Sequence, residues 1–468
     1  MIMIPDDAVE RLLESCTAIG AQCDKAGVQQ WEVFATQGYG HSLDIEAHRI
    51  SMASGGGEGG FGLRVVEDGR YGYAHLVDVS SAARAVEQAI GIARKSPSIE
   101  GFELPGNQAT SKVEGMLDKS ILDVGPEDLL EQGDQVLAHV TEIDSRAVAV
   151  GGGIGVGASA GAIMTSSGIE AGGIHTSHGI GIHVSIDQDD LLTSSYEGET
   201  SRSMLENIES SVERAVHWSQ ITRDRVEGGE SADCPVLLTP GGFAPLFSMV
   251  VPTAVTGERL ARGESFWSGK MGETVMSGHL GLVDDGRMEG GLSSGSRDDE
   301  GVPTQTQTLV EGGKLVGQLW STRDAARQVA EGNVENASTT GSAARGGHTS
   351  PPGCGCGDLV LTSSAKRMDR DRLIEEMENG YVVHSVMGAH TANPTSGDFS
   401  VTTSTILKVS NGEIVGALSQ AGFSGNMAKA LAGESILGTA QTRKSSYTTG
   451  SMHVSDILLR DGLRINPA

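Results

Sequence analysis

Positively charged residues are scarce in this sequence. Lys and Arg together number 34 against 61 Asp and Glu, which gives a formal net charge of −27. A surface of this sign repels phosphate, so the composition argues against non-specific binding to nucleic acid and against binding to an anionic membrane surface. We therefore expect no nucleic-acid partner and no membrane partner.

Cysteine and long apolar runs are also scarce. The five cysteines are an odd number at irregular intervals, unlike the disulfide framework of a small secreted protein. The N-terminus turns acidic at Asp6 and lacks the basic and apolar regions of a signal peptide. The uncharged stretch 147–164 contains six glycines, which favours strand and turn over a membrane span. These features predict a cytoplasmic protein.

Glycine, in contrast, is abundant. The chain contains 66 glycines in 468 residues, roughly twice ordinary usage. No G-x-y period accompanies them, which excludes a collagen-like helix. Glycine placed between short apolar runs indicates many turns, so we expect a protein rich in strands.

The N-terminal half alternates helical and strand patterns. Apolar residues recur at helical spacing after Asp6 and again from Ala82 to Ala93, and strand-like alternation lies around 31–35 and 43–47. We expect the glycine-rich segment Gly55–Gly62 to be a loop between strands. Further elements expected in this half are helices near 129–140 and 204–216 and glycine-rich strands between 146 and 195. A sheet meander with packed helices predicts an α+β module.

The C-terminal half has a different texture, in which strands dominate. Turn signals at Glu311–Lys314 and at Asn411-Gly412 indicate β-hairpins, the second with a type I′ turn. A polar, glycine-containing stretch at 225–233 separates the two textures. The sequence therefore predicts an α+β protein with an N-terminal α+β domain over 1–230 and a mostly β, barrel-like C-terminal domain over 231–468.

Two local patterns resemble binding motifs but lack the necessary context. Gly55–Gly60 matches G-x-G-x-x-G formally, yet a strand pattern follows it instead of the helix that a dinucleotide site requires. The histidines His175, His178 and His183 lie in a stretch typical of a strand, where only His175 and His183 share a face. Structural roles are therefore favoured for both segments.

A third pattern leaves a metal site open as an alternative. Cys354 and Cys356 flank one glycine, and His348 precedes them by six residues. Zinc usually takes four ligands with wider cysteine spacing, and no second pair is near in the sequence. The prolines and glycines around these residues favour an exposed loop. A zinc-binding role for His348, Cys354 and Cys356 is thus a less favoured hypothesis, and we expect no metal in this chain.

Several catalytic signatures are missing. The sequence contains no G-x-S-x-G elbow, no Walker A motif and no catalytic-cysteine signature. It also contains neither H-E-x-x-H nor H-E-x-x-x-H.

Four segments, in order along the chain, resemble the TldD/PmbA peptidase family. They are Gly62–Ala74, Asp298–Thr304, Met387–Val401 with its N-P-x-[ST]-G-[DE]-F-S core, and Ile406–Gly416 followed by Gly425-Asn426. The match runs essentially from end to end. The TldD-like branch of this family carries H-E-x-x-x-H on a helix, where the histidines hold zinc and the glutamate serves the attacking water.

This sequence departs from that motif at every position that matters. The corresponding segment is Gly242–Ala254, in which Met249 and Ala254 stand at the histidine places and Val250 at the glutamate place. None of the three can bind zinc or polarise a zinc-bound water, and no cysteine follows Cys356 to supply the late ligand. The chain therefore resembles the PmbA (TldE) branch, which lacks the zinc motif.

The resemblance implies a function without catalytic residues in this chain. PmbA-like members pair with a TldD-like subunit to form a heterodimeric protease acting on peptides, so zinc is expected in the partner and no cofactor here. A regulatory protein-binding module, suggested by the label of gyrase modulator in the family, is an alternative. A standalone hydrolase with a relocated metal is a less favoured one.

The resemblance also singles out one turn as a candidate for the substrate cleft. Asn393, Ser396, Gly397, Asp398 and Phe399 occupy its motif positions. Pro394 restrains the backbone and Gly397 permits a tight bend, which would hold Asp398 and Phe399 in fixed directions. The favoured interpretation is a structural turn, and the alternative is a turn that lines the cleft and holds an extended peptide by strand addition.

Overall fold

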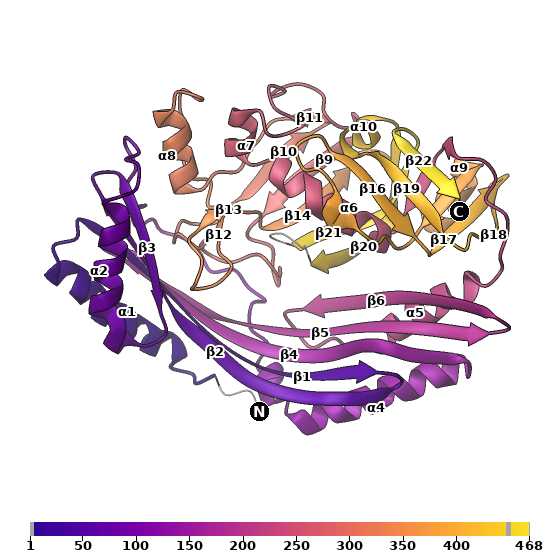
Figure 1. The fold of residues 1–468 in the computed structure, drawn as a ribbon, viewed down its shortest axis with the longest axis horizontal. Coiled ribbons are helices and arrows are strands. Elements are labelled where there is room, and N and C mark those ends of the chain that lie inside the picture. Colours follow the sequence, from indigo (N-terminus) through magenta and orange to yellow (C-terminus); the bar gives the residue numbers. More distant parts are fainter. Residues whose placement is uncertain (1–3, 446–450, 468) are drawn as a thin grey trace.

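The N-terminal half is built on one antiparallel sheet of long, curved strands. The computed structural model describes residues 4–445 and 451–467. Six strands lie in the order β3-β2-β1-β4-β5-β6, and several of them run nearly the length of the molecule (Figure 1). Their bounds are β1 (Gln30–Glu46), β2 (Arg49–Glu67), β3 (Arg70–Leu76), β4 (Ala147–Thr165), β5 (Glu170–Gln188) and β6 (Leu191–Ser201).

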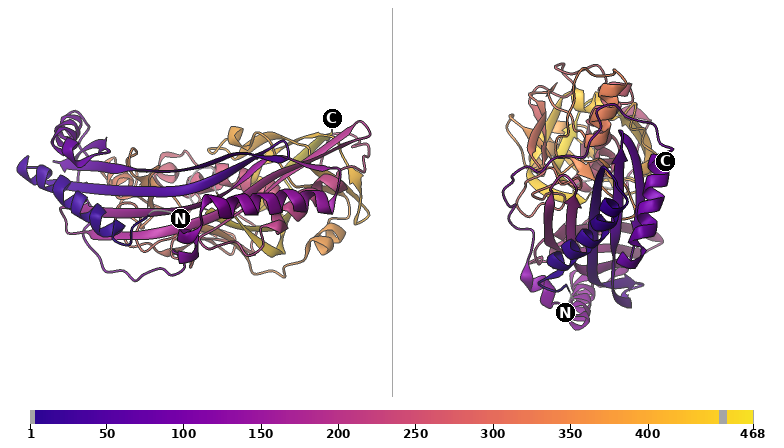
Figure 2. Two further views of the ribbon diagram at one scale, coloured as in Figure 1. Left: turned by 90° about the horizontal axis from the view of Figure 1, so that it is seen from below. Right: turned by 90° about the vertical axis from the view of Figure 1, so that its left-hand side faces the viewer.

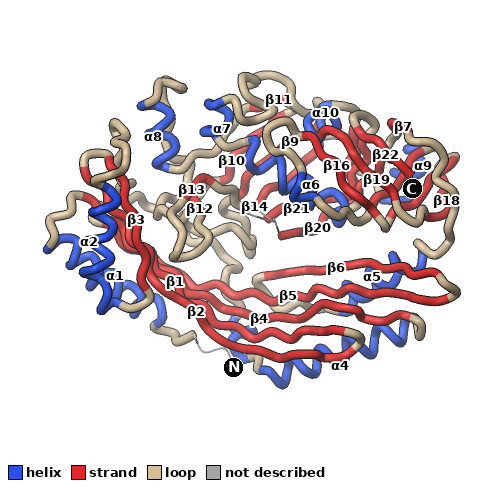
Figure 3. The backbone as a smooth tube through the Cα atoms, in the orientation of Figure 1, coloured by secondary structure: helices blue, strands red, loops and turns tan. Residues whose placement is uncertain are grey.

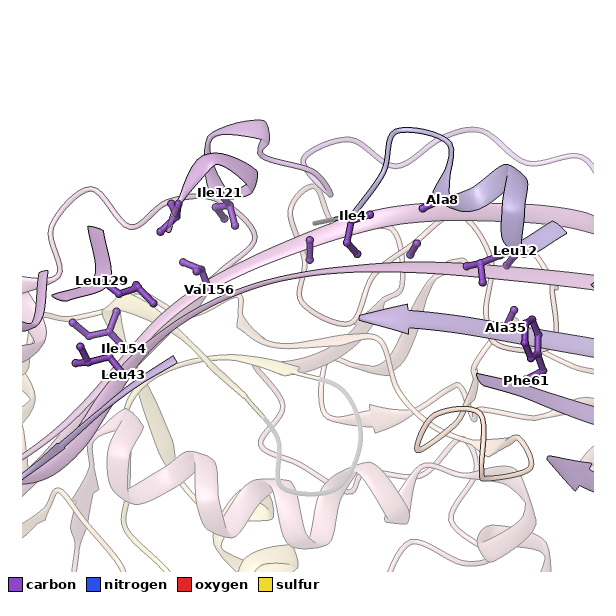
Figure 4. Close-up of a cluster of buried hydrophobic side chains, with 14 of the residues drawn as sticks. Ile4, Ala8, Leu12, Ala35, Leu43, Phe61, Ile121, Leu129, Ile154 and Val156 are labelled. Carbon is purple, nitrogen blue, oxygen red and sulfur yellow. The ribbon is translucent and has the colours of Figure 1, made fainter. Parts of the chain in front are cut away.

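Helices cover one face of this sheet (Figure 2). They are α1 (Ala8–Lys25), α2 (Ala82–Ala93), α4 (Pro126–Ile143) and α5 (Glu209–Ile221), with the shorter η1 (Val79–Ser81) and α3 (Lys119–Asp123). Alternate side chains along each strand point to this face and form the core. Leu43 of β1 and Ile154 of β4, for example, lie beside Leu129 of α4 (Figure 4).

Two segments of this half differ from what the sequence predicts. Gly55–Gly62, expected to be a loop, continues strand β2 without interruption and pairs with β1 throughout. The glycines permit this because the neighbouring backbone leaves little room: a Cβ at Gly57 or Gly59 would lie within 3 Å of a β1 carbonyl oxygen. The helix expected at 204–216 is α5, which begins and ends five residues later.

The C-terminal half contains a ten-stranded mixed sheet, a four-stranded sheet and a two-stranded ribbon. The large sheet has the order β11-β10-β9-β14-β21-β8-β15-β17-β18, with β20 beside β21; the small sheet has the order β16-β19-β22-β7, and β12 pairs with β13. Figure 3 shows these strands packed above the long N-terminal sheet. The prediction of an α+β fold with a mostly β C-terminal part is confirmed.

The elements of this half have the following bounds. The strands are β7 (Ala232–Asp233), β8 (Val236–Leu238), β9 (Leu280–Asp285), β10 (Thr306–Glu311), β11 (Lys314–Leu315), β12 (Ala343–Ala344), β13 (Gly353–Cys354), β14 (Asp358–Ser363), β15 (Gly380–Val383), β16 (Asp398–Thr403), β17 (Ile406–Ser410), β18 (Glu413–Ala417), β19 (Ala421–Asn426), β20 (Ser435–Ser445), β21 (Ser451–Leu459) and β22 (Leu463–Pro467). The helices are α6 (Pro240–Ala254), α7 (Gly257–Arg262), α8 (Thr322–Ala330), η2 (Ala389–Thr391), α9 (Arg370–Met377) and α10 (Met427–Ala432).

Both predicted hairpins are present. Gly312 and Gly313, with φ of 52° and 77°, connect β10 to β11, and Asn411 and Gly412, with φ of 53° and 77°, connect β17 to β18. Two successive residues with positive φ are the property of a type I′ turn, which glycine and asparagine adopt most readily. Within the described residues, no helix is long and apolar enough to cross a membrane.

Candidate functional site

Helix α6 carries Gly242–Ala254, the segment that the sequence resemblance is expected to match to a zinc helix. It begins with Pro240 in its first turn, where a missing amide hydrogen costs nothing, and it is apolar nearly all round. Val250 and Ala254 are fully buried, and Met249 is half-buried. Helix α6 packs against β8, β20 and β21 in the core of the C-terminal half. The three motif positions therefore present only hydrocarbon and one thioether, which are not zinc ligands.

The less favoured metal hypothesis gains no geometric support. Within residues 4–445 and 451–467, no group of three or more His, Cys, Asp or Glu side chains is arranged to hold a metal ion, so His348, Cys354 and Cys356 do not form a ligand set. The Cys356 thiol faces the Pro252 carbonyl of α6 at 3.9 Å, whereas the His348 carbonyl accepts from Tyr73 of β3 at 2.7 Å. Burial raises the pKa of the Cys354 and Cys356 thiols well above the ordinary value, so both are held in the neutral, unreactive form.

The turn singled out in the sequence is a closely hydrogen-bonded unit before β16. The Asn393 side-chain oxygen accepts from the amides of Thr395 and Ser396 at 2.9 and 3.3 Å. The Gly397 amide donates to the Asn393 carbonyl at 2.8 Å, and the φ of Gly397 is 78°. Gly397 thus supplies the left-handed conformation that the bend requires.

Asp398 is exposed and joins this turn to Asn426, at the end of the last of the four family segments. Its carboxylate accepts from the Asn426 side-chain amide at 2.7 Å and from the Ser396 hydroxyl at 2.6 Å. These hydrogen bonds hold the pKa of Asp398 below its ordinary value. Phe399 points the other way and packs against Phe423 with ring centroids 5.0 Å apart. The sequence motif is thus a hydrogen-bonded turn in which the Asp398 carboxylate bonds to the side chains of Ser396 and Asn426.

A buried ion cluster between the two halves was not foreseen from the sequence. Arg64 of β2 donates to Glu32 of β1 and, at 2.5 Å, to Glu300 of the D-D-E-G segment. Arg345 donates to Glu32 and lies over the Phe34 ring at 4.6 Å. The side chains of Arg64, Glu32, Glu300 and Arg345 are fully buried. This cluster gives the D-D-E-G segment a role in joining the halves.

Asp298 holds the backbone of the same D-D-E-G segment through hydrogen bonds. Its two oxygens accept from the backbone amides of Glu300, Val302 and Ala343 at 2.9 to 3.0 Å. Burial, together with the negative charge of Glu300, raises the pKa of Asp298 to about 8. Burial thus favours the neutral form of this carboxyl group, whereas the three amide donors favour the ionised form.

A second junction between the halves centres on His384, just after β15. Its Nε2 lies 2.8 Å from a carboxylate oxygen of Glu197 in β6, and its Nδ1 lies 2.8 Å from the Thr239 hydroxyl before α6. The Trp218 ring of α5 stacks on the imidazole at 3.8 Å between centroids. The four residues are far apart in the sequence, and no local motif marks them.

Comparison with known proteins relates the chain to one family. Residues 231–461 match the family model described as the PmbA/TldA metallopeptidase C-terminal domain, and residues 31–93 match PmbA/TldA metallopeptidase domain 1. An uncharacterised protein of Methanocaldococcus jannaschii is 26% identical over 89% of this chain and 92% of its own length. A Haemophilus influenzae protein named as a homologue of metalloprotease TldD is 29% identical, but over only 38% of this chain and 35% of its own length.

Solved structures agree with this assignment at the level of the fold. TldE from Thermococcus kodakarensis superposes with a TM-score of 0.86 at 24% identity, covering 96% of this chain and all of that one. A protein described as a putative modulator of a DNA gyrase, from Thermotoga maritima, superposes with a TM-score of 0.83 at 20% identity, covering 97% and 99%. With both family models matched in order and the same fold from end to end, the chain belongs to the PmbA/TldD metallopeptidase family.

Proposed function

We propose that this chain is the non-catalytic subunit of a cytoplasmic, two-subunit metalloprotease that acts on peptides or unfolded segments. A TldD-like partner carrying H-E-x-x-x-H supplies the zinc and the chemistry. The observation that carries the proposal is the composition of α6. By the sequence resemblance, Met249, Val250 and Ala254 take the places of the zinc ligands and the catalytic glutamate, and Val250 and Ala254 are fully buried.

The residues present on α6 do not fit a zinc ion. A tetrahedral zinc site needs nitrogen, sulfur or oxygen donors, and a catalytic one also needs an open position for water. Methionine offers only a weak thioether donor, and valine and alanine offer none. We therefore derive no hydrolytic step for this chain, and its contribution is to shape the partner's substrate access.

The test compares the chain alone with the chain and its partner together. The partner is a homologue carrying H-E-x-x-x-H, sought in the neighbouring reading frame and co-expressed. We expect the isolated chain to contain far less than one zinc per molecule and to cleave no peptide. We expect the co-purified pair to contain zinc and to show peptidase activity that a chelator abolishes. Stoichiometric zinc or chelator-sensitive activity in the chain alone would overturn the proposal.

A further inference from the structure

The outer edge of strand β2 is unpaired from Arg49 to Gly59. On its inner side β2 pairs with β1 along its whole length, but on its outer side β3 pairs only with the section from Phe61 to Glu67. Within the described residues, no strand or isolated bridge takes up the outer edge before that section. Between the free edge and the section paired with β3, the His348 ring lies against Gly60.

The direction of the backbone groups on this edge follows from the neighbouring carbonyls. The oxygens of Thr36, Gly38 and Asp44 point from β1 toward β2, where they approach Gly59, Gly57 and the Ser51 hydroxyl. In an antiparallel pair, alternate residues bond across the pair and the others point away. The even-numbered residues opposite these carbonyls are therefore bonded to β1. The outward groups are those of Ser51, Ala53, Gly55, Gly57 and Gly59.

This edge has few of the features that normally protect a sheet edge. Folded proteins protect edges with charges, proline, bulges, short strands or a covering segment. Between Arg49 and Glu58 the strand has neither a charged residue nor a proline. Its register with β1 shifts near its beginning, where Asp44 pairs with Met52 and Ile45 with Ile50, so Ser51 is an extra residue at the start of the free edge. Residues 51–58 are exposed, and Gly59 is half-buried. A free edge of this length is a template for another extended chain.

We propose that the β2 edge from Ser51 to Gly59 binds an extended peptide segment as an added strand. This inference deepens the proposed function, on which it rests, by assigning a site and a substrate class. Main-chain hydrogen bonds would give the affinity, and the sequence of glycines from Gly55 to Gly57 leaves few side chains to select among peptides. Glu58 and the high negative charge of the chain favour a peptide that carries lysine or arginine.

A transient peptide fits this edge better than a permanent subunit. A stable interface buries about 800 Å² on each partner around an apolar centre. Of the residues on the free edge, only Ile50, Met52 and Ala53 are apolar with a side chain. On the sheet face without helices, adjoining hollows of about 580 and 510 Å³ lie beside Gly56. They leave room for peptide side chains of different sizes.

A synthetic peptide tests the backbone requirement directly. The probe is a fluorescein-labelled nonapeptide of alternating lysine and threonine, and its control is the same peptide with N-methyl groups on alternate residues. Removing backbone donors along one edge should weaken binding to the full chain by about tenfold or more in fluorescence anisotropy. Equal binding of the two peptides, or no binding of the unmodified one, would overturn the proposal.

Variants at one residue locate the site. Ala53 points its amide outward, so Ala53→Pro removes one donor without breaking the ladder with β1, and Ala53→Val keeps that donor. We expect Ala53→Pro to weaken binding of the unmodified peptide by about tenfold relative to Ala53→Val. Bound peptide should also slow hydrogen exchange at the outward amides from Ser51 to Gly59 in the unmodified protein. Unchanged exchange, or equal binding by the two variants, would place the peptide elsewhere and overturn the proposal.

These measurements use the chain without its partner, so their result is independent of the test of the proposed function. If the chain binds the peptide at β2 but does not pair with an H-E-x-x-x-H subunit, the site stands and the subunit role falls. If the chain pairs and the pair cleaves peptides while β2 binds none, the subunit role stands and this inference falls.

Discussion

Arg64 of the N-terminal sheet donates to Glu300 of the C-terminal half at 2.5 Å, and both side chains are fully buried. Burial alone would raise the pKa of Glu300, but the Arg64 guanidinium outweighs it and holds that pKa below its ordinary value. Both groups are therefore charged in the folded protein. A buried pair of this kind is costly to break, because the remaining charge has no partner.

Replacing Arg64 with alanine should destabilise the protein by about 3–5 kcal/mol, since it leaves Glu32 and Glu300 buried without their shared partner. Urea unfolding followed by circular dichroism measures this loss. The control is Arg372→Ala, which removes an exposed partner of Glu375 and Glu376 and should leave the unfolding midpoint close to that of the unmodified protein. An Arg64→Ala protein as stable as the control would show that the cluster does not hold the halves together.

A second prediction concerns the pH dependence of stability through Asp284 of β9. Burial raises the pKa of Asp284 from its ordinary value of 3.8 to about 7, and the neighbouring charges of Asp358 and Asp285 add to the shift. The folded protein keeps a proton that the unfolded chain releases above about pH 4. The unfolding free energy therefore falls as pH rises from about 4 to about 7, by up to about 1.4 kcal/mol per pH unit from this group.

Asp284→Asn removes this titration while its amide oxygen can still accept from the Gly357 amide, which donates to Asp284 at 2.7 Å. We expect the variant to gain stability over the unmodified protein between about pH 5 and about pH 7, with no further gain above the folded-state pKa. Denaturant unfolding at several pH values measures the difference. A constant difference between the two proteins over this range would contradict the prediction.

The elements that the sequence predicts well are those determined by local chemistry. Asn411-Gly412 can form a type I′ turn in any context, and the apolar spacing of Ala82–Ala93 suits a helix that covers a sheet. Gly55–Gly62 was predicted wrongly because its strand conformation depends on β1, and glycine alone favours a turn. Pairing with β1, and not the local sequence, therefore determines that Gly55–Gly62 is a strand.

The buried clusters depend on tertiary contacts that no local pattern reports. Arg64 meets Glu300 across 236 positions, and Arg345 meets Glu32 across 313. The D-D-E-G segment was visible as a family motif, but its role required the structure. The candidate cleft turn can be located from its motif, whereas its hydrogen bond to Asn426 of the last family segment is evident only in three dimensions.

The buried positions of α6 allow a third prediction. Ala254 is fully buried, so Ala254→His must place a larger, polar ring in the packed core and should cost at least about 2 kcal/mol. Met249 is half-buried, and Met249→His should cost less than about 1 kcal/mol because its ring can reach water. Chemical unfolding of both variants measures these values. If Ala254→His were fully tolerated, the helix would have room at this position for a metal ligand, and the core role of Ala254 would be wrong.

The last prediction concerns Asp398, which is exposed at the turn before β16 and accepts from Ser396 and Asn426. We expect Asp398→Ala to reduce peptide turnover by the reconstituted heterodimer by about tenfold, which corresponds to roughly 1.4 kcal/mol of lost transition-state stabilisation. Assembly and thermal stability should stay close to those of the unmodified pair, because the backbone bonds between Asn393, Gly397 and Asp398 remain.

The matched control is Asn426→Ala, which removes the donor to Asp398 together with the cap of α10, since the Asn426 side chain also accepts from the Lys429 amide at 2.9 Å. That variant should lose stability, because the loss of a helix cap costs about 1 kcal/mol. It therefore gives the result expected in the same assays from a purely structural defect. If Asp398→Ala behaves like this control and lowers stability or blocks pairing, the turn is scaffold alone and its role in the cleft is wrong. If it lowers turnover with stability and pairing unchanged, the exposed carboxylate acts on the peptide or on its path, because the fold around it is intact.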